Sequence, residues 1–294
     1  MSLSIFTSAS SMASTNAMNK SNNLLSTAME RLGTGKRINS AADDAAGLQI
    51  ATRLQGQTNG MTVAQRNISD ATALLQTSEG AFDEVSNIMY RMKDLATQAA
   101  NDTNTQKDRD AINSELNDLN SELGNIMNNT SYAGDKLFGA SGKFANALNF
   151  QIGSSTDETM EVNLSTELKG GTGALTNASG QFNKIQSLVT NTASGLQLKS
   201  ADDAKKLMTA LEGSLDDVGS VRSKMGASIN RLGHTAANLA NMKDNTDLAL
   251  SNIQDADYAT EASTMSRNQL LAQTSMSMLK QSNSMSSMVM SLLG

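Results

Sequence analysis

The residues of this chain best suited to catalysis are pairs of adjacent aspartates. Two carboxylates act as general acid and base when they face one bond from opposite sides. Neighbouring residues on a helix point about 100° apart, so adjacent aspartates cannot flank one bond. We therefore predict that these aspartates are helix-start charges and solvated surface groups. The pairs are Asp43–Asp44, Asp202–Asp203 and Asp216–Asp217.

The other candidates for catalysis or metal binding are incomplete. His234 is the single histidine and Thr235 follows it, whereas a metalloprotease helix needs H-E-x-x-H. Asp102, Asn104 and Gln106 have the spacing of a calcium loop, but the glycine and the bidentate glutamate of such a loop are missing. The chain has no cysteine, which excludes a disulfide framework and thiol chemistry. We predict no enzyme activity, no cofactor and no metal.

The composition favours long helices that pack in narrow seams. In 294 residues there is no proline and no tryptophan, and aromatic residues make up 3%. Proline breaks helix interiors, so its absence permits uninterrupted helices. The net charge of −6 without a basic stripe argues against nucleic-acid or anionic-membrane partners. No apolar stretch is long enough for membrane insertion, and no Sec-type signal peptide is expected.

The first long element that the sequence predicts is a helix over residues 41–100. Ser40 with Asp43 three residues later is close to a capping box, which favours a helix start at Ser40. Beyond it, one position in each group of three or four is apolar, a heptad pattern that predicts a coiled-coil seam. The seam positions are Leu54, Met61, Ala64, Ile68, Ala71, Leu75, Ser78, Phe82, Val85, Met89, Met92, Ala96 and Ala99.

Three further elements are predicted downstream. A polar break at 101–108 precedes a second heptad from Ile112 to Ile126, and the short connection predicts an antiparallel helix. Alternating apolar residues over 144–165 predict a β-hairpin. Helical spacing returns from about 180 and continues to Ile253. The predicted fold class is mainly α: long antiparallel helices forming a coiled-coil bundle, with a small β-hairpin region.

The two ends of the chain are similar in composition. Residues 1–19 carry no charged side chain, and residues 268–294 carry only Lys280. Both ends are rich in serine, asparagine, alanine and methionine. Such thin apolar faces bury little surface alone, so we expect both ends to be disordered in an isolated monomer and helical when packed on partners.

Five stretches of this sequence resemble the signatures of bacterial flagellins. The N-terminal signature is matched by SNNLLSTAMERLGTGKRINSAADDAAGLQIATRL (21–54), NISDATALLQTSEGAFDEVSNIMYRMKDLATQAAN (67–101) and SEL…TSYAGDKLF (114–138). The C-terminal signature is matched by RSKMGASINRL (222–232) and IQDADYATEASTMSRNQLLAQ (253–273). The resemblance covers residues 1–165 and 200–294, with the motifs in the family's order.

The resemblance implies a domain organisation. Residues 1–40 and 255–294 would form the terminal coiled-coil domain, and residues 41–165 and 181–254 the long-helix bundle with its hairpin. Residues 166–180 would be a flexible remnant of the outer variable region that the family usually inserts there. We therefore expect a minimal flagellin.

The resemblance also implies function and location. The chain would be a structural subunit that polymerises with copies of itself into the extracellular flagellar filament for motility. The flagellar type III apparatus would export it. Implied partners are an export chaperone at the C-terminal region and the hook-associated and cap proteins. The alternative is a hook–filament junction protein, which would cap and not elongate.

Two sets of site residues follow. By resemblance, Arg91, Leu95 and Glu115 match the surface recognised by the vertebrate innate immune flagellin receptor. Arg91 and Leu95 are four residues apart and fall outside the heptad seam, which permits contact with a partner; the alternative is that they pack on the neighbouring helix or the next subunit. For packing between subunits we expect the apolar residues Leu24, Leu25, Leu32, Ile38, Leu270, Leu279 and Leu292.

Overall fold

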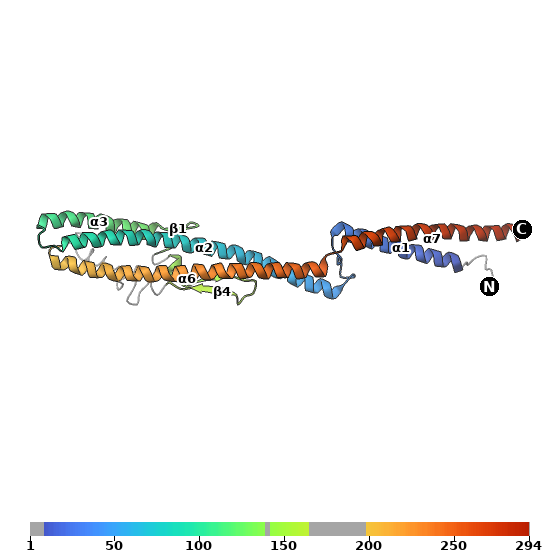
Figure 1. The fold of residues 1–294 in the computed structure, drawn as a ribbon, viewed down its shortest axis with the longest axis horizontal. Helices are drawn as coiled ribbons and strands as arrows, with labels where there is room; N and C mark the ends of the chain where they lie inside the picture. The colour runs from blue at the N-terminus through green and yellow to red at the C-terminus, as the bar shows by residue number, and fades with distance from the viewer. Residues whose placement is uncertain (1–8, 139–141, 165–197, 294) are drawn as a thin grey trace. The chain divides into compact units, whose positions relative to one another are not determined.

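The computed structural model describes residues 9–138, 142–164 and 198–293, with side chains up to residue 285 (Figure 1). The chain divides into two compact units, residues 1–58 with 244–294, and residues 59–243. This division falls within two long helices, α2 (Ala45–Ala99) and α6 (Ala201–Gln254). The domain boundaries at 40 and 255 stay a prediction. The predicted loop 166–180 and residues 181–197 lie outside the described residues.

The unit of residues 59–243 is built on three long helices. Figure 1 shows α2, α3 (Gln106–Asn129) and α6 side by side. Two ion pairs align α2 with α6: Lys93 Nζ lies 3.0 Å from Glu212 Oε1, and Arg222 Nη2 lies 3.0 Å from Asp83 Oδ1. Higher numbers on one helix meet lower numbers on the other, so these helices are antiparallel, as predicted.

The heptad predicted along α2 is confirmed by burial. Every seam position from Met61 to Ala99 is buried, and Leu54 is half-buried. Ser78, the polar member, is fully buried, and its hydroxyl donates to the carbonyl of Leu74 at 2.8 Å. Burial of a hydroxyl reduces the free energy of unfolding only slightly when the hydroxyl makes a hydrogen bond within its own helix.

Helix α2 has a second apolar column, which the predicted heptad with two apolar positions did not include. Leu74, Ala81, Ile88 and Leu95 repeat every seven residues and belong to, or pack against, the core. Three apolar positions per heptad make the wider stripe of a helix that packs on more than one neighbour. Ion pairs from Arg91 to α3 and from Lys93 to α6 show α2 facing both helices.

The start of α2 differs from the prediction. Asp44, not Ser40, is the N-cap: its Oδ1 accepts from the backbone N–H of Gly47 at 2.8 Å. Ser40 and Asp43 form a separate turn, in which the Ser40 N–H donates to Asp43 Oδ2 at 2.9 Å. The helix starts at Ala45 because Asp44 is the carboxylate that reaches a free N–H of the first turn.

The predicted hairpin is confirmed, and a smaller one precedes it. Strands β3 (Leu148–Gln151) and β4 (Thr159–Val162) pair antiparallel, with Leu148 opposite Val162. Strands β1 (Ser131–Tyr132) and β2 (Asp135–Lys136) form the smaller hairpin. Its two turn residues, Ala133 and Gly134, have φ of 52° and 90°. Positive φ at both positions is the pattern of a type I′ turn.

Aromatic contacts fix the segment between the two hairpins. The Phe82 ring on α2 meets Phe138 edge to face, with centroids 4.9 Å apart, and Phe138 stacks on Phe144 at 5.9 Å. Phe144 lies in a short 3₁₀ helix, η1 (Lys143–Ala145). These rings are buried, so they hold this irregular segment against the core.

The other unit pairs α1 (Ala9–Thr34) with α7 (Tyr258–Leu293). The helices are antiparallel, since Ser10 hydrogen-bonds Ser282 at 2.9 Å and Arg31 Nη1 lies 3.0 Å from Glu261 Oε1. Their less exposed residues follow a heptad. The heptad positions on α1 are Ser11, Ser14, Met18, Ser21, Leu25, Ala28 and Leu32, and on α7 Glu261, Met265, Asn268, Ala272, Ser275, Leu279 and Ser282; Thr15, Thr27, Arg31 and Thr264 beside them are half-buried as well.

Candidate functional site

The seam between α1 and α7 is made mostly of small and polar side chains. It leaves large apolar side chains on the outside of the helix pair. Leu24 is 45% exposed on α1, and Leu270 is 64% exposed on α7. Other exposed apolar side chains of these helices are Met12, Met29, Tyr258, Leu271, Met276, Met278 and Met285. Large exposed apolar patches are typical of sites of contact with other molecules.

The residues predicted to pack between subunits have three different environments. Leu24 and Leu270 are exposed, while Leu25, Leu32 and Leu279 are half-buried in the seam. Ile38 is 1% exposed, and its Cδ1 lies where a side chain on Gly47 would begin. The side chain of Leu292 lies outside the described residues. Leu25 occupies a heptad position in the seam and Leu24 does not, so two adjacent leucines of equal apolarity differ in exposure.

Two connecting segments pair beside the helix ends of this unit. The N–H of Arg37 donates to the Gln254 carbonyl at 2.7 Å, and the N–H of Ala256 donates to the Gly35 carbonyl at 2.9 Å. Gly35 has φ of 73°, a left-handed conformation that suits glycine. These bonds fix where both chain segments leave the α1–α7 pair.

The residues assigned to receptor contact by resemblance separate into two groups. Arg91 donates from Nε and Nη2 to Glu115 Oε1, at 3.1 and 2.7 Å, and both side chains are about half exposed. Leu95 is only 3% exposed because it belongs to the second apolar column of α2. The structure therefore brings Arg91 and Glu115 together on the surface and turns Leu95 inward, contrary to the accessibility expected from its heptad position.

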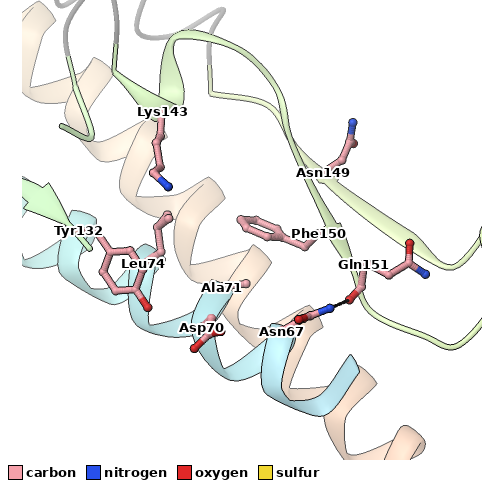
Figure 2. A pocket seen from close by; sticks show the side chains of 9 residues that line it. All are labelled: Asn67, Asp70, Ala71, Leu74, Tyr132, Lys143, Asn149, Phe150 and Gln151. Atoms are coloured by element: carbon pink, nitrogen blue, oxygen red, sulfur yellow. Dashed lines mark hydrogen bonds between the residues drawn. The ribbon is translucent and has the colours of Figure 1, made fainter. Parts of the chain in front are cut away.

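A hollow of about 400 Å³ is lined by residues of α2, β1, η1 and β3, and Figure 2 shows their side chains. The Asn67 amide donates to the Gln151 carbonyl at 3.2 Å and ties the larger hairpin to α2. Lys143 at the rim pairs with Asp135 at 3.0 Å. The lining residues are Asn67, Asp70, Ala71, Leu74, Tyr132, Lys143, Asn149, Phe150 and Gln151. No two of their groups make a nucleophile–base contact among the hydrogen bonds described.

Hydrogen bonds near helix starts lower the pKa of several aspartates. The Thr260 hydroxyl donates to Asp257 at 2.7 Å and lowers the pKa of that carboxyl. Backbone N–H groups of Ser40 and Asn39 lower the pKa of Asp43 in the same way. Such shifts arise from hydrogen bonds within a turn, as at Asp43, or within a helix cap, as at Asp257. Within the described residues, no cluster of three metal-ligating side chains occurs, and no helix there could cross a membrane.

The fold and its surfaces define a class: a helical structural protein whose long helices bury one another and whose terminal helix pair keeps an apolar outer surface. The chain belongs to the bacterial flagellin family. The model of the flagellin N-terminal helical region matches residues 5–143, and that of the C-terminal helical region matches residues 208–293. The chain is accordingly a structural subunit of the flagellar filament and not an enzyme.

Relatives support the assignment over the whole chain. Polar flagellin F of Vibrio parahaemolyticus is 32% identical, and flagellin B of Vibrio anguillarum is 30% identical, with full coverage of both chains in each case. The first alignment spans 381 positions against 294 residues here, so that relative carries segments that this chain lacks.

A solved structure supports the fold alone. The putative flagellar hook-associated protein from Vibrio parahaemolyticus superposes with a TM-score of 0.58 at 17% identity. The match covers 72% of this chain and 100% of that protein.

Proposed function

We propose that the outer surface of α1 and α7 is where copies of this chain pack on one another in the filament. The observation that carries the proposal is the contrast between the small, polar seam and the exposed apolar residues beside it. Leu24, Leu270 and Leu271 stay outside the seam, where contact with another chain would bury them. Head-to-tail contact through such surfaces gives an open helical polymer.

The energetics favour this use of the surface. Burying a leucine side chain contributes about 1.5–3 kcal/mol. Leu24, Leu270 and Leu271 all have 45% or more of their surface exposed in the single subunit. Only Lys20, Glu30 and Arg31 on α1, and Glu261, Arg267 and Lys280 on α7, carry charge. Few charges therefore need to be desolvated when the surface is covered.

The first test is polymerisation of the purified chain in ammonium sulfate, which strengthens apolar burial. Electron microscopy of negatively stained samples should show long tubes. Short caps that never elongate would instead support the hook–filament junction alternative. Monomers alone would contradict self-assembly of this chain without another subunit.

Substitution then tests the surface itself. Leu270→Ser should abolish tube formation, while its melting temperature stays close to that of the wild type because the side chain is 64% exposed. Val63→Ser is the matched control, since Val63 is 48% exposed on α2, outside the proposed surface. Equal loss of tubes in both variants would contradict a role specific to α1 and α7.

The proposal extends to export and partners. We propose that the flagellar type III apparatus exports the chain to the extracellular filament, with a chaperone on α7 before assembly. Cap and hook-associated proteins would contact the same terminal surface at the filament ends. The absence of cysteine and the low charge of both ends support passage as an unfolded chain. A chaperone that protects residues 258–293 from protease in the unassembled chain would support this part.

A further inference from the structure

Among the described methionines, six are buried and six are exposed, and Met18, Met208 and Met265 are half-buried. Of 18 methionines, those buried in the described structure all lie in the unit of residues 59–243. The exposed ones are concentrated on the terminal helices. The buried set is Met61, Met89, Met92, Met127, Met160 and Met225; the exposed set is Met12, Met29, Met242, Met276, Met278 and Met285.

Three of the exposed methionines cluster on α7. Met276, Met278 and Met285 are 48%, 60% and 62% exposed. Met278 and Met285 continue a column that begins with Leu271, because residues seven apart share one side of a helix. The column lies beside the seam positions Ala272 and Leu279. This part of the apolar surface of α7 is therefore made largely of thioethers.

A thioether is the one apolar side-chain group that a peroxide converts directly into a polar group. One oxygen atom passes from hydrogen peroxide to sulfur; the O–O bond breaks and water leaves. The product, methionine sulfoxide, carries a strong hydrogen-bond acceptor. Burial of that acceptor without a donor is unfavourable, so a surface that must be covered by another chain loses its apolar character.

We propose that Met276, Met278 and Met285 are peroxide-sensitive modification sites, and that their conversion to sulfoxides blocks assembly of the free subunit. This rests on the proposed role of the α1–α7 surface in packing between subunits. The six core methionines are shielded, so oxidation leaves the helical unit of residues 59–243 folded. The modification thus acts on assembly and not on the fold.

The experiment treats the purified monomer with hydrogen peroxide and follows three quantities. Peptide mass spectrometry measures sulfoxide at each methionine, circular dichroism measures helix content, and pelleting with electron microscopy measures polymer. We expect sulfoxide at Met276, Met278 and Met285 before the core set, unchanged helix content, and a critical concentration for polymerisation raised about tenfold.

Two matched triple variants assign the effect. M276L/M278L/M285L keeps an apolar side chain of similar volume that peroxide does not oxidise. M12L/M29L/M242L removes the same number of exposed methionines from α1 and α6, so it tests whether the effect belongs to the methionines of α7. The α7 variant should polymerise after treatment, and the control variant should lose polymerisation as the wild type does. Loss in the treated α7 variant, or protection by the control, would overturn the proposal.

A second measurement does not depend on those substitutions. Methionine sulfoxide reductases of both stereospecificities should restore polymerisation of the oxidised wild type. Mass spectrometry would first show that the reductases have regenerated the thioethers. If the chain still does not polymerise, the inference about the methionines is overturned, and the proposed assembly function is not. Failure of the untreated wild type to polymerise would overturn the proposed assembly function and this inference with it, so the two failures are distinguishable.

Discussion

At the scale of single residues, two glycines of α2 show how one residue type serves different purposes. A Cβ at Gly47 would lie 2.5 Å from Asp44 Oδ2 and 2.8 Å from Ile38 Cδ1, whereas nothing lies within 4 Å of a Cβ at Gly56. Gly47 thus gives room to the helix cap and to the buried Ile38. Gly56 has no such neighbour and only weakens the helix.

Alanine substitution should separate these roles. Gly56→Ala should stabilise the chain by up to about 1 kcal/mol through helix propensity. Gly47→Ala gains the same propensity but disturbs the Asp44 cap, which costs about 1 kcal/mol, and it also displaces Ile38. We therefore expect Gly47→Ala to be no more stable than wild type in denaturant unfolding. A stabilisation equal to that of Gly56→Ala would contradict the close packing at Gly47.

The three residues matched to the receptor surface should respond differently to substitution. Leu95→Ala removes a core side chain and should cost about 2–5 kcal/mol of stability. Arg91→Ala breaks an exposed ion pair with Glu115 and should cost at most about 1 kcal/mol. If this surface binds the receptor, Arg91→Ala lowers the response of receptor-bearing cells at unchanged melting temperature. An unchanged response would contradict the match at Arg91.

At the scale of elements, the start of α3 is fixed by a reciprocal cap. The Thr105 hydroxyl donates to Asp108 Oδ2 at 2.7 Å, and the Thr105 N–H donates to the same oxygen at 2.9 Å. The N–H of Asp108 returns a bond to the Thr105 hydroxyl. This capping box explains why α3 begins immediately after the polar break, and its hydrogen bonds lower the pKa of Asp108.

The cap predicts a pH dependence. Because folding lowers the pKa of Asp108 below its ordinary value of 3.8, the ionised carboxylate stabilises the fold above that pH. This contribution is lost as the pH falls through the lowered value. Asp108→Asn should therefore melt below wild type at pH 7, with the gap closing in acid. Asp118→Asn, exposed on the same helix outside the cap, is the control; a gap independent of pH would contradict the mechanism.

Burial acts in the opposite direction on α6. Desolvation, with the neighbouring Asp216 as the second cause, raises the pKa of Asp217. Folding therefore disfavours the charged form of this carboxyl, and its ionisation opposes stability at neutral pH. The pKa shifts of Asp108 and Asp217 therefore have structural causes, a helix cap in one case and burial in the other.

At the scale of the whole molecule, the helical core does not depend on the C-terminal helix. The main core cluster of described buried residues extends from Met61 to Leu239 and includes no residue of α7. α7 packs on α1 in the other unit, through contacts such as Arg31 with Glu261. The core and the proposed assembly surface are thus formed by different parts of the sequence.

Deletion of residues 268–294 should separate these two properties. We expect the truncated chain to form no filaments, because it loses most of the outer surface of α7, including Leu270 and Leu271. The helices between residues 41 and 253 should remain folded, with a main thermal transition like that of the full chain by circular dichroism. Tubes formed by the truncated chain under the same salt conditions would contradict the role of this helix.

The sequence by itself determined the elements with regular periods. Burial along a helix–helix seam repeats every three and four residues, so Met61 to Ala99 and Ile112 to Ile126 revealed their buried sides without a structure. Period-two alternation did the same for β3 and β4. The order of the flagellin motifs likewise indicated the family before any coordinates.

Only the tertiary structure decided features that depend on a neighbour distant in sequence. Leu95 is buried because α2 packs on two helices, and the period of α2 alone does not say how many neighbours it has. The cap of α2 is a local feature: the choice between Asp44 and Ser40 depends on the backbone path through residues 40–44, which residue spacing alone does not give. Leu24 is exposed while Leu25 enters the seam, because the antiparallel register with α7 sets which side of α1 is covered.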